Sequence, residues 1–404
     1  MFDANRRAFL GAFALGAGSL AATRSFANDG HAAGYDVGPA GNFMQTVPRK
    51  SGDPLKFTFE LDNGPIKATS GGWARDFTSA RFPIATDIAG AHLFMNPGGA
   101  REMHWHNAAE WALILGGQCQ VTVVDPQGET EVANYGPGDL WFFPKGHAHS
   151  IQTLGKEPCH AFLAFDDGLY SDHGTFGVSD WMSRFDSKMM QQAYGLPADF
   201  LAGIPKAETY INQGEVIGLD SAQACNVKVL NAARSHRYSL LKQKPRESSP
   251  GGVFYVAAAT EYPVSSTMSS WFLQLKPGAL HKPHWHSNAS ELHYVVKGHV
   301  RMTMFGADKR MAASDVGPGE CAYVPQGCGH SLQNIGAEQA EVAGVLNSGT
   351  YSESTLSDWL VNAPRHLLAN NYGLPEARIA AVAKSGSVIA GAATDCHPMA
   401  HCSR

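Results

Sequence analysis

Short apolar runs that alternate with polar residues fill two long stretches of the chain, from about residue 55 to 165 and from about residue 239 to 346. Gly, Pro, Asn and Asp separate the runs, as they do on either side of residues 120–124 and residues 140–143. An alternation with a period of two places every second side chain on the same face of a strand. Short strands at this spacing predict an antiparallel sandwich or barrel in each stretch.

A helical pattern follows each strand-rich stretch. It runs from Ser179 to the Tyr-Gly-Leu-Pro segment at residues 194–197, and again from Ser357 to the same four residues at 372–375. Gly-Leu-Pro is typical of a helix end. The two Tyr-Gly-Leu-Pro segments are 178 positions apart. The pattern therefore indicates a tandem duplication of one unit, and the fold class it predicts is all-β with peripheral helices.

The N-terminus is typical of an export signal. Residues 5–10, Asn-Arg-Arg-Ala-Phe-Leu, resemble the twin-arginine motif, and an apolar stretch rich in Gly and Ala follows from Gly11 to Ala22. This stretch is too short for a stable membrane span, and Ser25-Phe26-Ala27 resembles a cleavage site. We therefore expect a bacterial periplasmic or secreted protein without a membrane span in its mature form.

These patterns divide the chain into five segments. We expect a signal peptide at 1–27, an N-terminal arm at 28–54, a first domain at 55–225, a second domain at 226–385 and a disordered tail at 386–404. The length of 404 residues agrees with two domains. A formal net charge of −5 gives no reason to expect nucleic acid as a partner.

One set of metal-ligand residue types occurs twice in the chain, once in each half. His-x-His on a strand directs two imidazoles to the same side, and a nearby carboxylate and a distant histidine complete the set. The first histidines of the two sets are 180 positions apart, and the last ones 181. The sequence thus predicts two metal sites, site one formed by His104, His106, Glu110 and His149, and site two formed by His284, His286, Glu291 and His330.

The donor set narrows the choice of metal without fixing it. Three imidazoles and one carboxylate leave two of six octahedral positions open, and the lack of thiolates argues against structural zinc. Mn(II), Fe(II), Ni(II) and Cu(II) all fit these donors. Two adjacent open positions suit a small bidentate anion, or an anion together with O2.

The spacing of these residues resembles the two cupin motifs, with Thr153 where a final Asn is usual in the first half. Within the cupins, the segment from Arg101 to His106, Glu110-Trp111 and the Phe-Asp-Asp-Gly segment at 165–168 resemble the bacterial oxalate decarboxylases. The motifs read Gly98-x5-His104-x-His106-x3-Glu110-x6-Gly117 and Gly138-x5-Pro144-x-Gly146-x2-His149, then Gly278-x5-His284-x-His286-x4-Glu291-x6-Gly298 and Gly319-x5-Pro325-x-Gly327-x2-His330-x3-Asn334.

The resemblance implies two tandem cupin domains, each a double-stranded β-helix or jelly roll. It implies two Mn(II) ions per chain, O2 as a co-catalyst, and decarboxylation of oxalate to formate and CO2. It also implies a homo-oligomer of trimers stacked into hexamers. Arg101 matches the family's substrate-binding arginine, although its odd spacing from His104 does not place it on the same strand face by simple alternation.

The fate of the substrate radical is the open question at site one. The family's decarboxylases carry a proton-donating glutamate on a lid segment, Ser-Glu-Asn-Ser-Thr. The matching residues here are Ser-Asp-His-Gly-Thr at 171–175, so Asp172 or His173 is the candidate donor. This departure keeps open an oxalate oxidase reaction that gives CO2 and hydrogen peroxide.

Site two differs from site one around its donors. His281 stands where site one has Arg101, and Gly344 occupies the position of a glutamate that is usual in the family. A carboxylate, Glu353, lies on a loop that is three residues shorter than the first. We therefore expect the chemistry at site one, and a structural, electron-transfer or other ligand role for site two. The rival interpretation is a periplasmic bicupin that binds or stores manganese.

Overall fold

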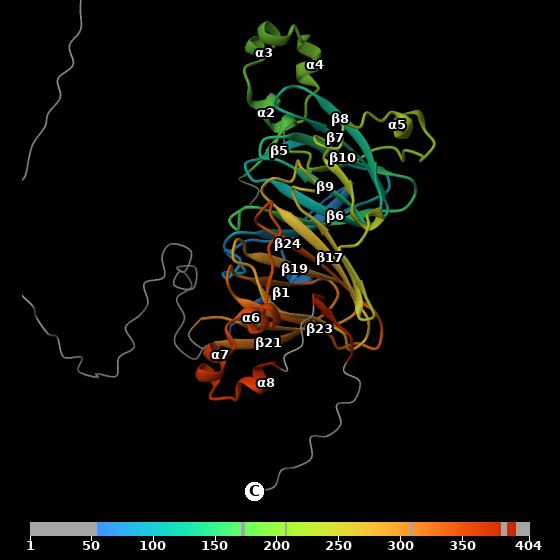
Figure 1. Ribbon diagram of the computed structural model, residues 1–404. Coiled ribbons are helices and arrows are strands. Elements are labelled where there is room, and N and C mark those ends of the chain that lie inside the picture. Colours follow the sequence, from blue (N-terminus) through green and yellow to red (C-terminus); the bar gives the residue numbers. More distant parts are fainter. Residues whose placement is uncertain (1–54, 171–173, 207, 308–309, 381–385, 393–404) are drawn as a thin grey trace, which may run out of the picture. The chain divides into compact units, whose positions relative to one another are not determined.

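The strands form two similar pairs of antiparallel sheets, one pair in each half of the chain. The computed structural model describes residues 55–170, 174–206, 208–307, 310–380 and 386–392. In each half a seven-stranded and a six-stranded sheet make a jelly-roll-like arrangement. The expected all-β fold with two tandem units is confirmed, and Figure 1 shows helices α2 to α4 and α6 to α8 outside the sheets.

The first half contains β2 to β13 and holds site one between its sheets. The larger sheet has the order β14-β9-β6-β11-β4-β3-β2, and the smaller has β12-β5-β10-β7-β8 with β13 beside β5. The bounds are β2 (Ile66–Thr69), β3 (Gly72–Phe77), β4 (Ala89–Met95), β5 (Gly99–His106), β6 (Glu110–Gly116), β7 (Gln118–Val124), β8 (Thr130–Tyr135), β9 (Asp139–Phe143), β10 (Ala148–Leu154), β11 (Cys159–Phe165), β12 (Thr175–Gly177), β13 (Ile211–Gln213) and β14 (Arg237–Ser239).

The second half repeats this topology with β15 to β26. Its larger sheet has the order β1-β22-β19-β24-β17-β16-β15, and its smaller has β21-β20-β23-β18-β25 with β26 beside β18. The bounds are β1 (Thr58–Glu60), β15 (Glu247–Ser249), β16 (Gly252–Ala257), β17 (Ser269–Leu275), β18 (Leu280–Trp285), β19 (Glu291–Lys297), β20 (Val300–Phe305), β21 (Met311–Val316), β22 (Glu320–Val324), β23 (Gly329–Asn334), β24 (Ala340–Leu346), β25 (Ser354–Thr355) and β26 (Ile389–Ala390).

The two halves exchange one strand each. β1 precedes the first half in sequence but pairs with β22 of the second, while β14 begins the second half and pairs with β9 of the first. Between the exchanged strands the indole of Trp111 donates to the hydroxyl of Ser270, and the rings of Phe162 and Tyr294 stack with centroids 4.2 Å apart. One apolar cluster therefore runs from the second half into the first, so burial couples the two units.

The motif glycines have a conformational reason for their spacing. All eight adopt a positive φ, which is the left-handed region that favours glycine. They stand in the turns that lead into and out of the donor strands, and they are Gly98, Gly117, Gly138 and Gly146 in the first half and Gly278, Gly298, Gly319 and Gly327 in the second. The duplicated spacing thus preserves turns that set where the donor strands begin.

The helical segments are shorter than the sequence pattern predicted. The first is divided into α2 (Val178–Arg184), α3 (Ser187–Tyr194) and α4 (Ala198–Ala202). The break is caused by Asp186, whose carboxylate caps α3 by accepting from the backbone N–H of Lys188 and Met189. The second is divided in the same way, into α6 (Leu356–Asn362), α7 (Arg365–Tyr372) and α8 (Glu376–Ala380), and α5 (Ala222–Cys225) lies in the connection between the halves.

Other expectations concern the ends of the folded unit. The prediction of a disordered tail from residue 386 is wrong for its beginning, since β26 pairs with β18 and the side chain of Ile389 is buried. Glu247 holds this strand by accepting from the backbone N–H groups of Val388 and Ile389. The signal peptide, the arm and the rest of the tail lie outside the described residues, and the domain boundaries stay predictions.

Candidate metal centres

Two neighbouring strands and a strand start supply the donors of site one. His104 and His106 lie on β5, His149 lies on β10 directly opposite His104, and Glu110 begins β6. All four side chains are buried, and one ligand atom from each lies within 4.8 Å of the others. The donors that the sequence predicted are therefore brought together.

A β-bulge brings Arg101 to the same side as the donors. Ile151 pairs with Arg101 and His149 pairs with His104, so β5 advances three residues where β10 advances two. The extra residue of a bulge interrupts the alternation of faces. The odd spacing that argued against placing Arg101 with the histidines is thereby explained, and the sequence gives no signal for this bulge.

The hydrogen bonds of the imidazoles fix which nitrogen faces the centre. The Nδ1 atoms of His104 and His149 contact the backbone carbonyls of Glu102 and His147 at 2.6 and 2.9 Å, so Nδ1 carries the proton. The Nε2 atoms then offer lone pairs to the centre, where His106 Nε2 lies 2.9 Å from a Glu110 oxygen. Imidazole lone pairs and a carboxylate oxygen that face one point fit a metal ion between them.

The ionisation of the donors also suits a metal. Burial, with the neighbouring Arg101, lowers the pKa of His104 well below its usual range, so its imidazole is neutral at pH 7. Burial alone would raise the pKa of Glu110, but hydrogen bonds to His106 and His149 outweigh it and lower this pKa. The indole of Trp141 donates to the other oxygen of Glu110 at 3.0 Å. A neutral imidazole and a charged carboxylate are the forms that bind metal.

A small cavity adjoins site one. Its volume is about 50 Å³, enough for a few non-hydrogen atoms, and its lining includes the donors His104, His106 and Glu110. Arg101 is the one formally cationic side chain of the lining, which is otherwise completed by Ala74, Asp76, Ala91, Leu93, Ile151, Leu163, Phe165, Tyr170 and Tyr210. The guanidinium is 7% exposed, and it donates to the carbonyl of Tyr210 and lies over its ring.

The candidate proton donors Asp172 and His173 lie outside the described residues. The residues on either side of them reach site one, since Thr175 Oγ1 lies 3.1 Å from His106 Nδ1 and the hydroxyl of Tyr170 lies 3.0 Å from Thr175. β12 begins at Thr175 and pairs with β5 opposite His106. Tyr170 and Thr175, the described residues that flank the two candidates in the sequence, therefore lie beside the donor His106.

Site two has the same plan. His284 on β18 pairs with His330 on β23, His286 follows β18, and Glu291 begins β19. The Nδ1 atoms of its three histidines contact the carbonyls of Lys282, Ser352 and Cys328, which directs each Nε2 inward. The four ligand atoms again lie within 4.8 Å of one another. Both predicted donor sets therefore fit a metal ion.

Comparison with known proteins agrees with this geometry. The sequence profile of the cupin family matches residues 60–199 and again residues 238–379. The oxalate decarboxylase OxdC of Bacillus subtilis is 34% identical over 313 residues, which cover 77% of this chain and 80% of that protein. The chain is a bicupin of the oxalate decarboxylase family.

Other relatives of this bicupin extend the comparison. A probable oxalate decarboxylase of Arthroderma benhamiae is 29% identical over 330 residues, 80% of this chain and 79% of that one. A solved structure of the Bacillus subtilis oxalate decarboxylase at pH 4.6 superposes with a TM-score of 0.78 at 31% identity and covers 84% of this chain and 89% of its own. Another, from work on the Mn(II) centres of that enzyme, superposes equally well, with coverages of 84% and 90%.

The two cupins differ in the side chains of two neighbouring strands of the larger sheet, β4 and β11 in the first cupin and β17 and β24 in the second. The strand registers place Trp271 on β17 where the first cupin has Ala91 on β4, and Gly344 where it has Leu163. A Cβ atom added to Gly344 would lie 2.1 Å from the indole of Trp271, so that ring occupies the room a side chain at this position would need. The indole donates to Glu291, as Trp141 does to Glu110 from another strand.

One further histidine of the second cupin was missed from the sequence. His293 lies two residues after Glu291 on β19, is fully buried, and has its Nε2 2.9 Å from an oxygen of Glu291. The Glu-x-His spacing was a sufficient signal, because residues i and i+2 of a strand share a face. Trp271 and Tyr210 gave no such signal, since their roles depend on contacts between distant strands.

Proposed function

We propose that this bicupin is a manganese-dependent oxalate decarboxylase and that its chemistry takes place at site one. The observation that carries the proposal is the cavity beside His104 and Glu110, small and lined by a buried guanidinium. Mn(II) and oxalate are the metal and substrate of the related bacterial enzyme. When bound, Mn(II) with O2 supplies the one-electron chemistry that weakens the bond between the two carboxylates.

The side chains of site one suit this reaction. Arg101 is positioned to hold a carboxylate by charge-assisted hydrogen bonds, and the backbone carbonyl and ring of Tyr210 keep its guanidinium in place. Leu93, Leu163 and Phe165 form an apolar part of the cavity wall. The net reaction takes hydrogen oxalate to formate and CO2, so the carbon–carbon bond breaks and one proton ends on the formate carbon.

The proton donor is proposed to come from the lid segment, as Asp172 or His173. Thr175 and Tyr170, which flank this segment in the sequence, lie beside His106. The proton donor decides the product, because protonation gives formate whereas further oxidation with O2 gives a second CO2 and hydrogen peroxide. We expect Asp172→Asn or His173→Gln, whichever removes the donor, to shift product from formate towards peroxide by about 10- to 100-fold.

One assay separates the candidate functions. The full chain is loaded with Mn(II), supplied with oxalate and O2, and followed for formate, CO2 and hydrogen peroxide. A decarboxylase gives formate and CO2 in equal amounts with little peroxide, and an oxalate oxidase gives two CO2 per peroxide. A manganese-storage bicupin keeps both ions and consumes no oxalate, and that result would contradict the proposal.

Export and assembly belong to the proposal as well. The described residues contain no helix long and apolar enough to cross a membrane. We propose twin-arginine export to the periplasm or the medium on the basis of residues 5–10, which lie outside the described residues. We propose a homo-oligomer, and the trimer or hexamer is taken from the family resemblance alone. Exposed apolar side chains on the peripheral helices, among them Trp181, Tyr194, Trp359 and Tyr372, support an interface.

A further inference from the structure

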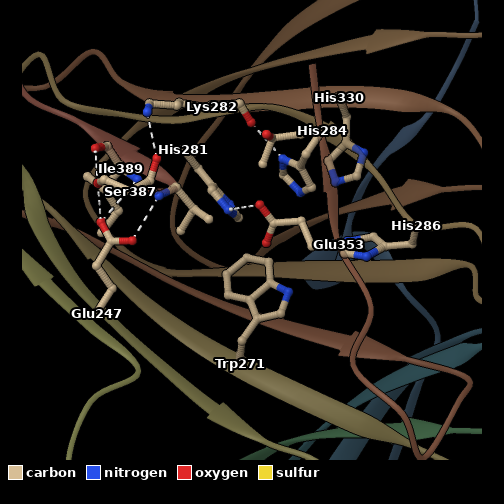
Figure 2. Close-up of polar contacts among 12 residues, drawn as sticks. Glu247, Trp271, His281, Lys282, His284, His286, His330, Glu353, Ser387 and Ile389 are labelled. Carbon is tan, nitrogen blue, oxygen red and sulfur yellow. Dashed lines mark hydrogen bonds and ion pairs between the residues drawn. The ribbon is translucent and has the colours of Figure 1, made fainter. Parts of the chain in front are cut away.

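The last described strand of the second cupin, β26, corresponds to β13 of the first. β13 pairs with β5 opposite Arg101, and β26 pairs with β18 opposite His281. Glu247 fixes β26 by accepting from the hydroxyl of Ser387 and from the backbone N–H of Ile389. Figure 2 shows the Glu247 carboxylate beside these two residues. The duplication therefore extends to the strand that ends each cupin.

The chain follows the same course directly after both strands. A Cβ atom added to Gly98 would lie 2.6 Å from the carbonyl oxygen of Gly214, and one added to Gly278 would lie 3.0 Å from Cβ of Ala392. Both contacts involve the third residue after the isoleucine that pairs with β5 or β18. The two paths are thus equivalent as far as the described residues reach.

In the first cupin the chain then covers the outer face of the smaller sheet, the face turned away from the metal donors. Ile217 forms a bridge to Leu154, the last residue of β10. Helix α5 lies over β7 and β8, where the side chains of Gln120 and Asn134 both donate to the carbonyl of Ala224. Leu154 is 2% exposed, so this connection buries the outer face.

The equivalent face of the second cupin is exposed in the described part of the chain. The strand registers place Arg301 and Asp315 where the first cupin has the two side chains that bond Ala224, and both are about half exposed. Ile335 stands 181 positions after Leu154 and is 41% exposed. A surface that one cupin buries is therefore left uncovered in the other by the residues described.

An apolar groove of about 560 Å³ continues this face. Thr303 and Phe305 follow Arg301 at intervals of two on β20, so they share its side of the sheet, and both line the groove together with Met311 of β21. The groove also reaches β18 and β23, the strands that carry His284 and His330. Exposed apolar surface in a groove is typical of a binding site.

The chain itself supplies a segment of the right length and position. Residues 393–404 follow Ala392 and read Ala-Thr-Asp-Cys-His-Pro-Met-Ala-His-Cys-Ser-Arg, and their equivalents at 215–226 contain Ile217 and α5. Twelve extended residues span up to about 40 Å, whereas the six residues of β18 span about 20 Å. Pro398 and Met399 come about 20 Å after Ala392 in an extended chain, which is far enough to reach the groove.

We propose that residues 393–404, the C-terminal tail, bind across the outer face of the second cupin in their own chain, with Pro398 and Met399 in the apolar groove. The tail thereby covers this cupin as the connection between the halves covers the first. Met399 stands where Ser221 caps α5, so the tail binds as an extended segment without that helix. The inference does not depend on the reaction at site one.

A thiol in the tail allows the contact to be trapped. Ile217, which bridges Leu154, corresponds to the residue directly before Cys396, and Ile335 corresponds to Leu154. Ile335→Cys in a Cys402→Ser background should therefore form a disulfide with Cys396, because the two Cα atoms come within the reach of such a bond. The full chain is treated with oxidised glutathione, and mass spectrometry of tryptic peptides measures the linked fraction.

Lys276→Cys in the same background is the matched control. Lys276 is exposed and lies two residues before Gly278, so the tail can reach it, but it stands at the end of β17 in the larger sheet. We expect at least about 10-fold less linkage there, since only a docked segment raises the effective concentration at one position. Equal linkage at both positions, no link at Ile335→Cys, or a link between two chains on a non-reducing gel would each overturn the proposal.

Hydroxyl-radical footprinting tests the same contact without a substitution on the face. The full chain is compared with a chain that ends at Ala392 and so keeps β26. Oxidation of Ile335 and Phe305 should be at least about 3-fold slower in the full chain, because the docked tail removes both side chains from solvent. Ile66 of the first cupin, which is 54% exposed, should react equally in both chains. Equal oxidation of Ile335 and Phe305 in the two chains would contradict the proposal, whether the face is open or covered by a second copy.

Discussion

Sites one and two have the same donors but different surroundings, and the difference arises from a few side chains on the strands behind them. In site one Ala91 leaves a cavity of about 50 Å³ and Arg101 places a positive charge in it. In site two Trp271 occupies the corresponding position, packed against Gly344. Duplication therefore preserved the metal donors, while the volume and the charge next to them diverged.

Trp141 and Trp271 show how the two cupins keep the same support for the glutamate donor while the space beside it differs. Each site gives its glutamate one indole hydrogen bond, from Trp141 on β9 in site one and from Trp271 on β17 in site two. β9 and β17 lie at different places in their sheets, and Ala322 takes the position of Trp141 in the second cupin. An indole hydrogen bond to the glutamate donor can thus come from β9 or from β17. Only the tryptophan on β17 occupies the position that Ala91 leaves open as the cavity of site one.

The largest expected effect comes from removing the charge of site one. Arg101→Gln should lower kcat/KM for oxalate by about 1000-fold, or about 4 kcal/mol, because one carboxylate of the substrate loses its cationic partner in a buried site. Arg101→Lys keeps the charge but loses the planar guanidinium, so we expect a smaller loss. Steady-state kinetics with formate detection measures both variants.

The control for Arg101 is an arginine that takes no part in the site. Arg301→Gln removes the same charge from an exposed pair with Asp315 on the second cupin and should leave turnover unchanged. Retained activity in Arg101→Gln, together with a loss of activity in His281→Arg, would show that the two sites have been assigned the wrong way round.

A second prediction gives site one the filled interior of site two. Ala91→Trp combined with Leu163→Gly copies the pair Trp271 and Gly344, and the indole should occupy the cavity. We expect kcat/KM to fall by about 100-fold while manganese remains bound, at a stability cost of about 1–3 kcal/mol. Leu163→Gly alone is the matched control, since it enlarges the space instead of filling it. If the double variant decarboxylates oxalate normally, the cavity is not the substrate site.

The sequence predicted the features that fixed motif spacings carry. The eight donors and the duplicated unit follow from one set of spacings that recurs about 180 positions further along the chain. The approach of Arg101 to the donors depends on a bulge, and Trp271 reaches Gly344 only through the pairing of β17 with β24. Contacts between strands distant in sequence leave no period or spacing to detect.

The exchange of β1 and β14 between the cupins was hidden for the same reason. Both are three-residue strands, too short for an alternation to be recognised, and their partners are more than 90 residues away. Each helical segment was predicted as continuous because the breaks are short. Asp186 and Pro364 each stand at the N-terminus of a new helix, α3 and α7, within the apolar pattern. The export signal and the lid residues Asp172 and His173 stay predictions.

The smallest expected effect concerns how the two cupins respond to acid. Burial, with the nearby His160, lowers the pKa of His92 from 6.5 to about 4, and the second cupin has Phe272 at this position. The unfolded chain takes up this proton below pH 6.5 while the native chain does not until about pH 4. The contribution of His92 therefore destabilises the native state progressively as the pH falls from 6.5 to 4.

His92→Phe should remove this loss. Between pH 7 and pH 4 the variant should lose less unfolding free energy than wild type, by about 1–3 kcal/mol, as a pKa shift of this size implies at most. Urea unfolding followed by circular dichroism at both pH values measures the difference. His366→Phe on the exposed side of α7 is the control and should follow wild type. If His92→Phe also follows wild type, His92 is not the source of the acid sensitivity, and this difference between the two halves disappears.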